Sequence, residues 1–200
     1  MGDEATDTTE AGQEPQSRRL LPRDQRRAQL IRAGAAAFAR RGFAETGLED
    51  VAREAGVTRA IIYRHFASKT DLYQAILDQT QAQLRDHLGV PEQYDQNTVR
   101  ALVGAACDDP DGFRLLFVHA QREPDFAAVA EQRNQVAAKI TESYLSERLP
   151  DAAHRRWIAS LIPKLTIELI LSWLDAGRPT GPDEFVKTIR ATSQALAAGR

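Results

Sequence analysis

Cysteine is nearly absent from this sequence, with Cys107 the single example in 200 residues. One thiol cannot form a disulfide within the chain or supply the several thiolates of a structural zinc site, and this usage is typical of a reducing cytosol. Histidine is also scarce, and the four histidines show no metal-ligand spacing. We therefore expect no metal, no cofactor and a cytoplasmic location.

Residue patterns typical of catalysis are missing as well. Ser146, Ser160 and Ser172 have no evident His–acid partners in the sequence. Cys107 stands beside two aspartates rather than beside a histidine. The sequence therefore predicts that the protein is not an enzyme. An all-α enzyme is kept as an alternative, which turnover of any substrate by the pure protein would support.

Long apolar runs are lacking too. No stretch approaches the ~20 apolar residues that span a bilayer, so no membrane partner is expected. The first 17 residues contain five acids and no Lys or Arg, which is unlike a secretory signal peptide. With almost no apolar residues to bury, this acidic tail, 1–17, is predicted to be disordered.

The remaining charge is unevenly distributed along the chain. Residues 18–88 carry 13 Lys and Arg against 8 Asp and Glu, whereas residues 89–200 carry 13 against 15. A basic N-terminal third beside a mildly acidic remainder is typical of a nucleic-acid-binding module joined to a second domain. Chance clustering of solvated charge is the alternative, because the excess is small.

Helical periodicity is clear in the N-terminal third. Apolar residues at helical spacing predict a first helix over about 23–41, which Pro22 can start and Gly42 can stop. A second, short helix ends at Gly56, and a third begins with Thr58 as its cap. Two short helices joined by a tight turn predict a helix-turn-helix.

Further helices are predicted downstream, and no strand pattern is evident. Ser68 caps a long fourth helix, and prolines and glycines punctuate five more. These five are expected at about 97–107, 111–121, 125–148, 152–176 and 183–198. The predicted fold class is therefore all-α, with about nine helices in a three-helix helix-turn-helix domain and a larger helical domain.

One short stretch, AGVTRAIIYRHFASK at 55–69, gathers long polar side chains around two adjacent isoleucines. The stretch contains no acid, so its mostly cationic donors have no charge partner nearby in the sequence. We interpret it as a surface whose hydrogen-bond acceptors lie outside the chain.

The longer stretch GFAETGLEDVAREAGVTRAIIYRHFASKTDLYQAIL resembles the N-terminal domain of the TetR family of transcriptional repressors. The resemblance covers about residues 24–80. It rests on AGV at the turn, RRGF at the end of the preceding helix, and four residues spaced three apart: Tyr63, Phe66, Lys69 and Leu72.

The resemblance implies a repressor that binds a palindromic operator in double-stranded DNA as a homodimer and is released by a small-molecule effector. The helix-turn-helix domain is then expected at 18–67, and a helical effector-binding and dimerisation domain at 68–200. The second region varies widely within the family. A DNA-binding dimer without small-molecule control, acting as an activator or under a protein partner, is the alternative.

Residues of the third helix are expected to divide between the core and DNA. Three apolar residues point inward: Val57, Ile62 and Phe66. The outer face then meets the major groove, where Arg59 can donate two hydrogen bonds to a guanine, worth ~1–3 kcal/mol of base discrimination. Ala60 permits close approach, and Ile61 either touches a thymine methyl group or is half-buried.

Other DNA contacts are implied by the resemblance. Tyr63, His65 and Lys69 resemble the family's phosphate contacts, which set register and affinity. Thr58, at the start of the third helix, is counted with them. Where the family often has another hydroxyl residue this chain has Gly47, and Thr46 either replaces that contact or does not. Upstream, three arginines form an arm on the DNA or a solvated basic lead-in: Arg18, Arg19 and Arg23.

The predicted helix at 152–176 is apolar on more than one side. A helix that is apolar all round is buried all round, which in a small chain favours a partner subunit on one side and the domain core on the other. The resemblance also implies that the last two helices form the dimer. Two recognition helices ~34–36 Å apart would match a palindromic operator.

An effector cavity between helices of the second domain would be lined by large side chains, each of which is otherwise plain core. Glu168 stands among apolar neighbours, where an unpaired buried carboxylate is costly. It pairs with Lys164, bonds across the dimer or meets a ligand. The candidate ligand-binding residues are Phe113, Phe117, His119, Tyr144, Trp157, Leu161, Leu165, Glu168 and Trp173.

Overall fold

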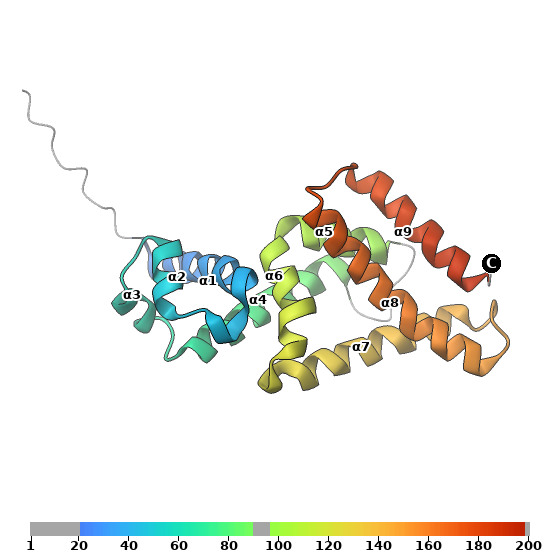
Figure 1. Ribbon diagram of the computed structural model, residues 1–200, viewed down its shortest axis with the longest axis horizontal. Coiled ribbons are helices and arrows are strands. Elements are labelled where there is room, and N and C mark those ends of the chain that lie inside the picture. Colours follow the sequence, from blue (N-terminus) through green and yellow to red (C-terminus); the bar gives the residue numbers. More distant parts are fainter. Residues whose placement is uncertain (1–20, 90–96, 199–200) are drawn as a thin grey trace, which may run out of the picture.

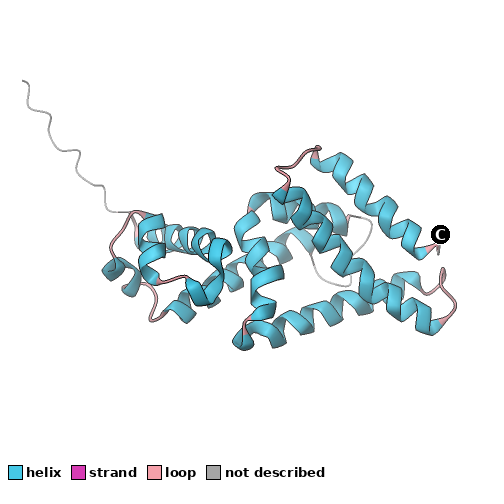
Figure 2. Cartoon of the chain, viewed as in Figure 1, coloured by secondary structure: helices cyan, strands magenta, loops and turns pink. Residues whose placement is uncertain are grey.

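The computed structural model describes residues 21–89 and 97–198. Within these ranges the chain consists of helices and short connections without a strand, so the predicted all-α class is confirmed (Figures 1 and 2). The acidic tail at 1–17 lies outside the described residues, as do Arg18 and Arg19.

The helices follow the predicted order and form two groups, which lie at opposite ends of the elongated molecule (Figure 1). The helix α4 (Lys69–Leu88) joins the two groups. The smaller group holds α1 (Arg23–Glu45), α2 (Leu48–Ala55) and α3 (Arg59–Tyr63). The larger group holds α5 (Thr98–Asp108), α6 (Pro110–Arg114), α7 (Pro124–Leu145), α8 (Ala152–Asp175) and α9 (Pro182–Ala197). A π-helical segment, η2 (Leu115–His119), and a 3-10 turn, η3 (Ala120–Arg122), connect α6 to α7.

Two predicted boundaries differ from the structure. The first helix is interrupted at Gly42 as predicted, because the φ of 79° there is not helical, but one further turn extends α1 to Glu45. The predicted helix at 111–121 is divided into α6, η2 and η3, since the backbone widens to a π-helix over Leu115–His119. Such widened turns are common at functional sites.

The turn between α2 and α3 depends on a glycine. Gly56 has φ 63° and ψ 34°, the left-handed conformation that a side chain disfavours. Its N–H bonds back to the last turn of α2, and three residues, 56–58, connect α2 to α3. Ile62 and Phe66 then enter a core that already contains Leu30 and Val51.

The two groups of helices share one continuous core. The aromatic rings of Phe38, Phe43, Tyr73 and Phe126 lie with centroids 5.0–6.4 Å apart. α1 packs against α6 and η2, where the side chain of His119 lies beside Gly42. A change in the larger group can therefore reach α1 by direct contact.

α8 packs along α7 and α9 in the larger group (Figure 1). By length and composition it could cross a membrane, with 24 residues and a mean hydropathy of 1.4 in its most apolar window. A search for an uninterrupted apolar run misses α8, because Lys164 and Glu168 interrupt it. A core helix of a soluble protein meets the same two criteria.

Candidate nucleic-acid interface and ligand cavity

α3 lies at the far end of the smaller group, with one face in the core and the other on solvent (Figure 1). Ile62 is fully buried and Phe66 nearly so, and these two side chains anchor the helix. Truncating a buried isoleucine of this kind costs about 2–5 kcal/mol. The opposite face is open at four positions: Arg59, Ala60, Tyr63 and, in part, Ile61.

Arg59 is not without an acid, contrary to the prediction made from residues 55–69. Glu49, in the first turn of α2, accepts a hydrogen bond from Nη1 of Arg59. Nη2 donates to the hydroxyl oxygen of Tyr63 at 2.6 Å, and the guanidinium lies 5.2 Å from the centre of that ring. The hydrogen bond to Tyr63 and the charge of Glu49 raise the pKa of Arg59. The local sequence could not reveal this pair, because Glu49 belongs to the neighbouring helix.

Thr46 does not offer its hydroxyl to a phosphate, which corrects that candidate contact. The residue is 1 % exposed, and its Oγ1 donates to the carbonyl oxygen of Gly42 at 2.7 Å. The cap of α2 is Gly47, whose N–H donates to the Asp50 carboxylate at 2.9 Å. This bond, together with Arg53, holds the pKa of Asp50 below its usual range.

Two other candidate contacts lie at helix starts. Thr58 is the exposed N-cap of α3, and its side chain makes no capping hydrogen bond. Lys69, in the first turn of α4, donates from Nζ to the carbonyl oxygen of Phe43 at 2.7 Å and lies 4.2 Å from the centre of that ring. Ser68 caps α4 by accepting from the N–H of Asp71, as predicted.

His65 is partly buried beside three arginines at the start of α1. Burial, followed by the positive charges of Arg23, Arg26 and Arg27, lowers the pKa of His65 below its usual value. The imidazole is therefore neutral near pH 7 and can donate one hydrogen bond. These arginines add positive charge around His65.

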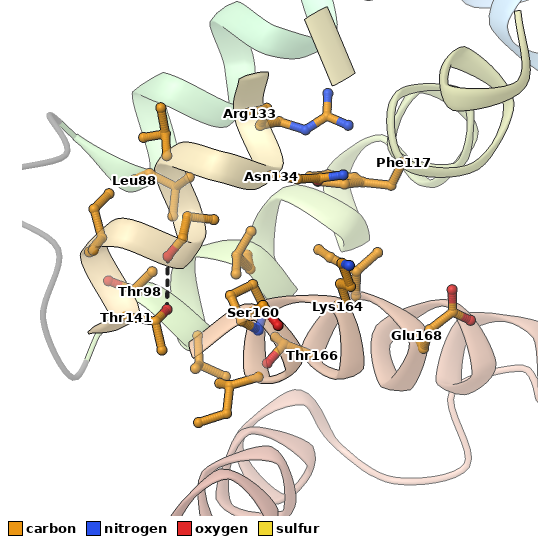
Figure 3. A pocket seen from close by; sticks show the side chains of 18 of the residues that line it. Leu88, Thr98, Phe117, Arg133, Asn134, Thr141, Ser160, Lys164, Thr166 and Glu168 are labelled. Atoms are coloured by element: carbon orange, nitrogen blue, oxygen red, sulfur yellow. Dashed lines mark hydrogen bonds between the residues drawn. The ribbon is translucent and has the colours of Figure 1, made fainter. Parts of the chain in front are cut away.

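The larger group of helices contains a cavity of about 460 Å³. Its walls come from α4, α5, α7 and α8, with Phe117 from η2 (Figure 3). Three of the predicted ligand-binding residues line it: Phe117, Tyr144 and Glu168. Glu168 is exposed at this wall rather than buried, and among the described residues no ion pair joins it to Lys164.

The structure does not bring the other six predicted ligand residues to this cavity. Phe113 is buried beside Phe117, and His119 faces α1. Trp173 stacks on Phe185 at 4.6 Å and donates from Nε1 to the carbonyl oxygen of Thr180. The remaining three lie on α8 outside the cavity lining: Trp157, Leu161 and Leu165.

The phase of α8 explains the error. The cavity meets a face that includes Ser160, Pro163, Lys164 and Ile167, spaced as successive turns of one helix face. Trp157, Leu161 and Leu165 follow a separate stripe, on which Trp157 is 61 % exposed. Because α8 is apolar on several sides, its sequence could not decide which face meets the cavity.

Sequence similarity identifies the family of this chain. Residues 30–76 match the family model of bacterial regulatory proteins of the tetR family. Over 177 residues the chain is 32 % identical to the HTH-type transcriptional activator FasR of Mycolicibacterium smegmatis, covering 84 % of this chain and 80 % of the relative. The chain belongs to the TetR family. The HTH-type transcriptional regulator TtgR of Pseudomonas putida is 52 % identical over 62 residues, which is 31 % of this chain and 29 % of TtgR.

Solved structures of regulators share this TetR fold. A TetR-like regulator from Rhodococcus sp. RHA1 superposes with a TM-score of 0.74 at 19 % identity, covering 90 % of this chain and 100 % of the other. NalD of Pseudomonas aeruginosa, described as the secondary repressor of a multidrug efflux pump, has a TM-score of 0.59 at 24 % identity, covering 86 % and 95 %. These likenesses concern the fold. As a member of the TetR family, the protein is a DNA-binding transcriptional regulator and not an enzyme.

Sequence reasoning missed several residues of the cavity in this TetR-family protein. α7 contributes polar side chains to the lining, including Arg133, Asn134 and Thr141, and η3 contributes Gln121. The lining residues of α7 recur at helical spacing, but they form a mixed polar face that does not resemble core. The TetR resemblance could not supply them either, because it covers only residues 24–80. In the described ranges, no group of three or more His, Cys, Asp or Glu side chains could hold a metal ion.

Proposed function

We propose that this TetR-family regulator binds a palindromic operator in double-stranded DNA as a homodimer, and that a small molecule in the cavity releases it. In this proposal residues 18–67 form the DNA-binding part, and residues 68–200 form the part that binds the effector and dimerises. The observation that carries the proposal is the solvent-exposed outer face of α3, edged by basic side chains. Such a regulator acts in the cytoplasm, where bacterial DNA lies.

In this proposal Arg59 exchanges Glu49 for a base. An exposed ion pair is worth only about 0–1 kcal/mol, whereas a bidentate contact with guanine O6 and N7 gives about 1–3 kcal/mol of discrimination. The contact with the base is therefore more stable than the ion pair with Glu49 when a guanine lies within reach of Arg59. Until DNA binds, Glu49 and Tyr63 hold the guanidinium. In the complex, Ala60 and Ile61 meet the neighbouring base edges.

Phosphate contacts come from four side chains on the same edge: Thr58, Tyr63, His65 and Lys69. The free hydroxyl of Thr58 and the neutral imidazole of His65 each can donate one hydrogen bond to a phosphate oxygen. Lys69 stands at the start of α4, where free backbone N–H groups also favour an anion. These contacts set register and affinity rather than sequence choice.

Dimerisation uses the outer stripe of α8 together with α9. Trp157 is 61 % exposed, and Leu161 and Leu165 are partly exposed, so three large apolar side chains share an uncovered face. A stripe of this kind on an apolar helix favours a self-complementary two-fold interface. The paired subunits then present two copies of α3 to successive major grooves.

Release by an effector acts through α4. Leu84 and Leu88 near its C-terminal end line the cavity, and Lys69 at its N-terminal end meets the DNA edge. A ligand that displaces the C-terminal half of α4 alters the distance between the two copies of α3 in the dimer. A coupling free energy of only about 1–3 kcal/mol between the two sites would change operator affinity by roughly 5- to 150-fold.

Activation is the second candidate function. FasR, a relative matched over 80 % of its length, is named a transcriptional activator. The same dimer activates when its operator lies beside the promoter and represses when the two overlap, so the protein geometry is common to both.

The test starts with selection of DNA by the full-length chain from a random library. Enrichment of an inverted repeat, bound by one dimer in light scattering, supports the proposal. Enrichment of a single unrepeated site bound by a monomer contradicts it. Titration of the complex with a broad panel of small molecules then tests release, and transcription of a reporter gene distinguishes repression from activation.

A further inference from the structure

Arg133 of α7 is a partly buried cation, and two of its hydrogen-bond donors are buried without a partner. Its Nε and Nη1 atoms are buried and have no partner among residues 21–89 and 97–198. Nη2 alone donates, to the carbonyl oxygen of Leu116 at 2.9 Å. Burial lowers the pKa of Arg133 to about 10, so the guanidinium is still charged at neutral pH.

No acid neutralises this cation in the described part of the chain. Asp125 and Arg133 both border a second hollow of about 50 Å³, yet no ion pair joins them. The flat guanidinium instead lies 4.5 Å from the centre of the Phe117 ring. Arg133 and Phe117 line the large cavity, where Figure 3 shows Arg133 projecting from α7.

The missing partner has to be an anion. A buried charge without a counter-charge is costly, and an unmade hydrogen bond of a buried donor costs about 1–3 kcal/mol. A ligand anion would remove both penalties, whereas a ligand cation would be repelled by Arg133. Lys164 on α8 adds a second positive charge to the wall. The negative charge of Glu168 offsets the positive charge of Lys164 only weakly, because Glu168 is exposed and its charge is screened by solvent.

The rest of the wall is mainly aliphatic. Side chains from α4, α5, α7 and α8 supply it: Leu84, Leu88, Val99, Leu102, Ile140 and Ile167. An apolar lining with a few placed polar groups is typical of a site that encloses a small molecule. The ligand therefore needs an apolar body as well as an anionic head group.

We propose that the cavity takes an amphipathic organic acid, whose anionic head group pairs with Nε and Nη1 of Arg133 and whose apolar body lies along the aliphatic wall. The inference rests on the proposed function, since it names the chemical class of the effector. The carboxylate of a free acid and the phosphate of an ester share the required charge, and the experiment separates them.

The same guanidinium connects the head group to the DNA-binding part. Its third nitrogen, Nη2, is bonded to Leu116 in η2, and η2 packs against α1 through His119 and Gly42. The small hollow beside Arg133 is also bordered by Gln74 and Gln81 of α4. An anion that draws the guanidinium toward the cavity therefore acts on η2 and α4 together.

The test measures binding of defined probes to the full-length chain by isothermal titration calorimetry, below the concentration at which each probe forms micelles. The probes share one dodecyl chain and differ in the head group: dodecanoate, dodecyl phosphate, methyl dodecanoate and dodecylamine. The aromatic acid 2-naphthoate and its methyl ester form a second acid–ester pair. We expect at least one acid to bind tenfold or more tightly than its neutral ester, and the amine to bind no better than the ester.

Variants then locate the charge. Arg133→Gln removes the cation and keeps most of the side-chain length, and we expect it to weaken binding of the anionic probe at least tenfold while binding of the neutral ester changes less than twofold. Lys139→Gln is the matched control, because Lys139 is exposed on the same helix and does not line the cavity. If Arg133→Gln does not fold, the comparison of acid, ester and amine with the wild-type chain decides alone.

The outcomes separate this inference from the proposed function. Equal binding of acid and ester, preference for the amine, or an unchanged affinity of Arg133→Gln for the acid overturns the inference, even where a neutral or cationic compound releases operator DNA. Binding of an anion through Arg133 without any change in operator affinity supports the inference and contradicts effector release. The tighter of dodecanoate and dodecyl phosphate identifies the head group.

Discussion

Among single residues, Arg59 has two competing partners, Glu49 and a base. Both side chains of the ion pair with Glu49 are more than half exposed to solvent, so the pair is weak. Lys69 differs, because its ammonium group lies over the Phe43 ring and donates to the backbone carbonyl oxygen of Phe43. The two cations are thus expected to contribute differently, Arg59 to sequence choice and Lys69 to affinity.

Arg59→Ala should relax base preference at one position of each half-site, with a loss of about 1–3 kcal/mol on the preferred operator and little loss on unrelated DNA. Lys69→Ala should weaken binding to all sequences and reduce the slope of log affinity against log salt by about 1 for each contact removed. Fluorescence anisotropy with operator and scrambled duplexes over a salt series measures both.

Arg148→Ala is a matched control, because Arg148 is exposed after α7, in the larger group of helices. It should bind both duplexes as the wild type does. Identical behaviour of Arg59→Ala and Lys69→Ala would show that the roles assigned to these two cations are wrong.

Glu49→Gln should raise affinity for scrambled DNA more than affinity for the operator. The substitution removes a negative charge from the DNA-facing edge and frees Arg59 for phosphates, so the specificity ratio falls and the salt dependence steepens. Binding constants for both duplexes at two salt concentrations test this. An unchanged ratio would mean that Glu49 does not hold Arg59 in the protein in solution.

Among the elements, the helix-turn-helix depends on the conformation of one glycine. Gly56 has a positive φ, and no heavy atom lies within 4 Å of the position that a Cβ would take. A substitution there meets no steric clash with neighbouring side chains, so its cost is conformational. α3 is only five residues long and depends on the α2 turn and on Ile62 for its orientation.

Gly56→Ala should lower the free energy of unfolding by about 1–2 kcal/mol, the cost of a left-handed residue with a side chain. Urea denaturation followed by circular dichroism measures this change. Gly177→Ala is the matched control, since Gly177 also has a positive φ, 75°, and open space around it. The control Gly177→Ala should lose similar stability and keep its operator affinity. Gly56→Ala should lose stability and also bind the operator more weakly.

For the whole molecule, the outer stripe of α8 and the cavity face of α8 serve different purposes. One face carries Lys164 and Ile167 toward the cavity, and the other leaves Trp157 largely exposed. A single helix thus connects the proposed effector with the proposed subunit partner.

Leu161→Arg should convert the dimer into a folded monomer that no longer binds the operator at concentrations where the wild type does. The leucine is partly exposed in the single chain, so the arginine can be solvated there but not within an apolar interface. Light scattering gives the mass, and circular dichroism checks the fold. Val129→Arg, a change at an exposed apolar site on α7, should remain dimeric. A monomeric wild-type chain would refute the dimer itself.

Sequence alone determined the helix order, the all-α fold class and the outer face of α3. These follow from local physical causes: apolar spacing sets helices, Gly56 and Ser68 set their ends, and the turn between two short helices sets which side of α3 is buried. Arg59, Ala60 and Tyr63 could therefore be assigned to the surface before any packing was known.

Only the tertiary structure decided which residues from distant segments meet. Glu49 reaches Arg59 from another helix, and Thr46 is buried by the kink at Gly42. The cavity face of α8 and the burial of the Arg133 nitrogens depend on how α7 and α8 pack. The sequence of a helix that is apolar all round, or mixed along one face, does not determine which face is packed against its neighbour.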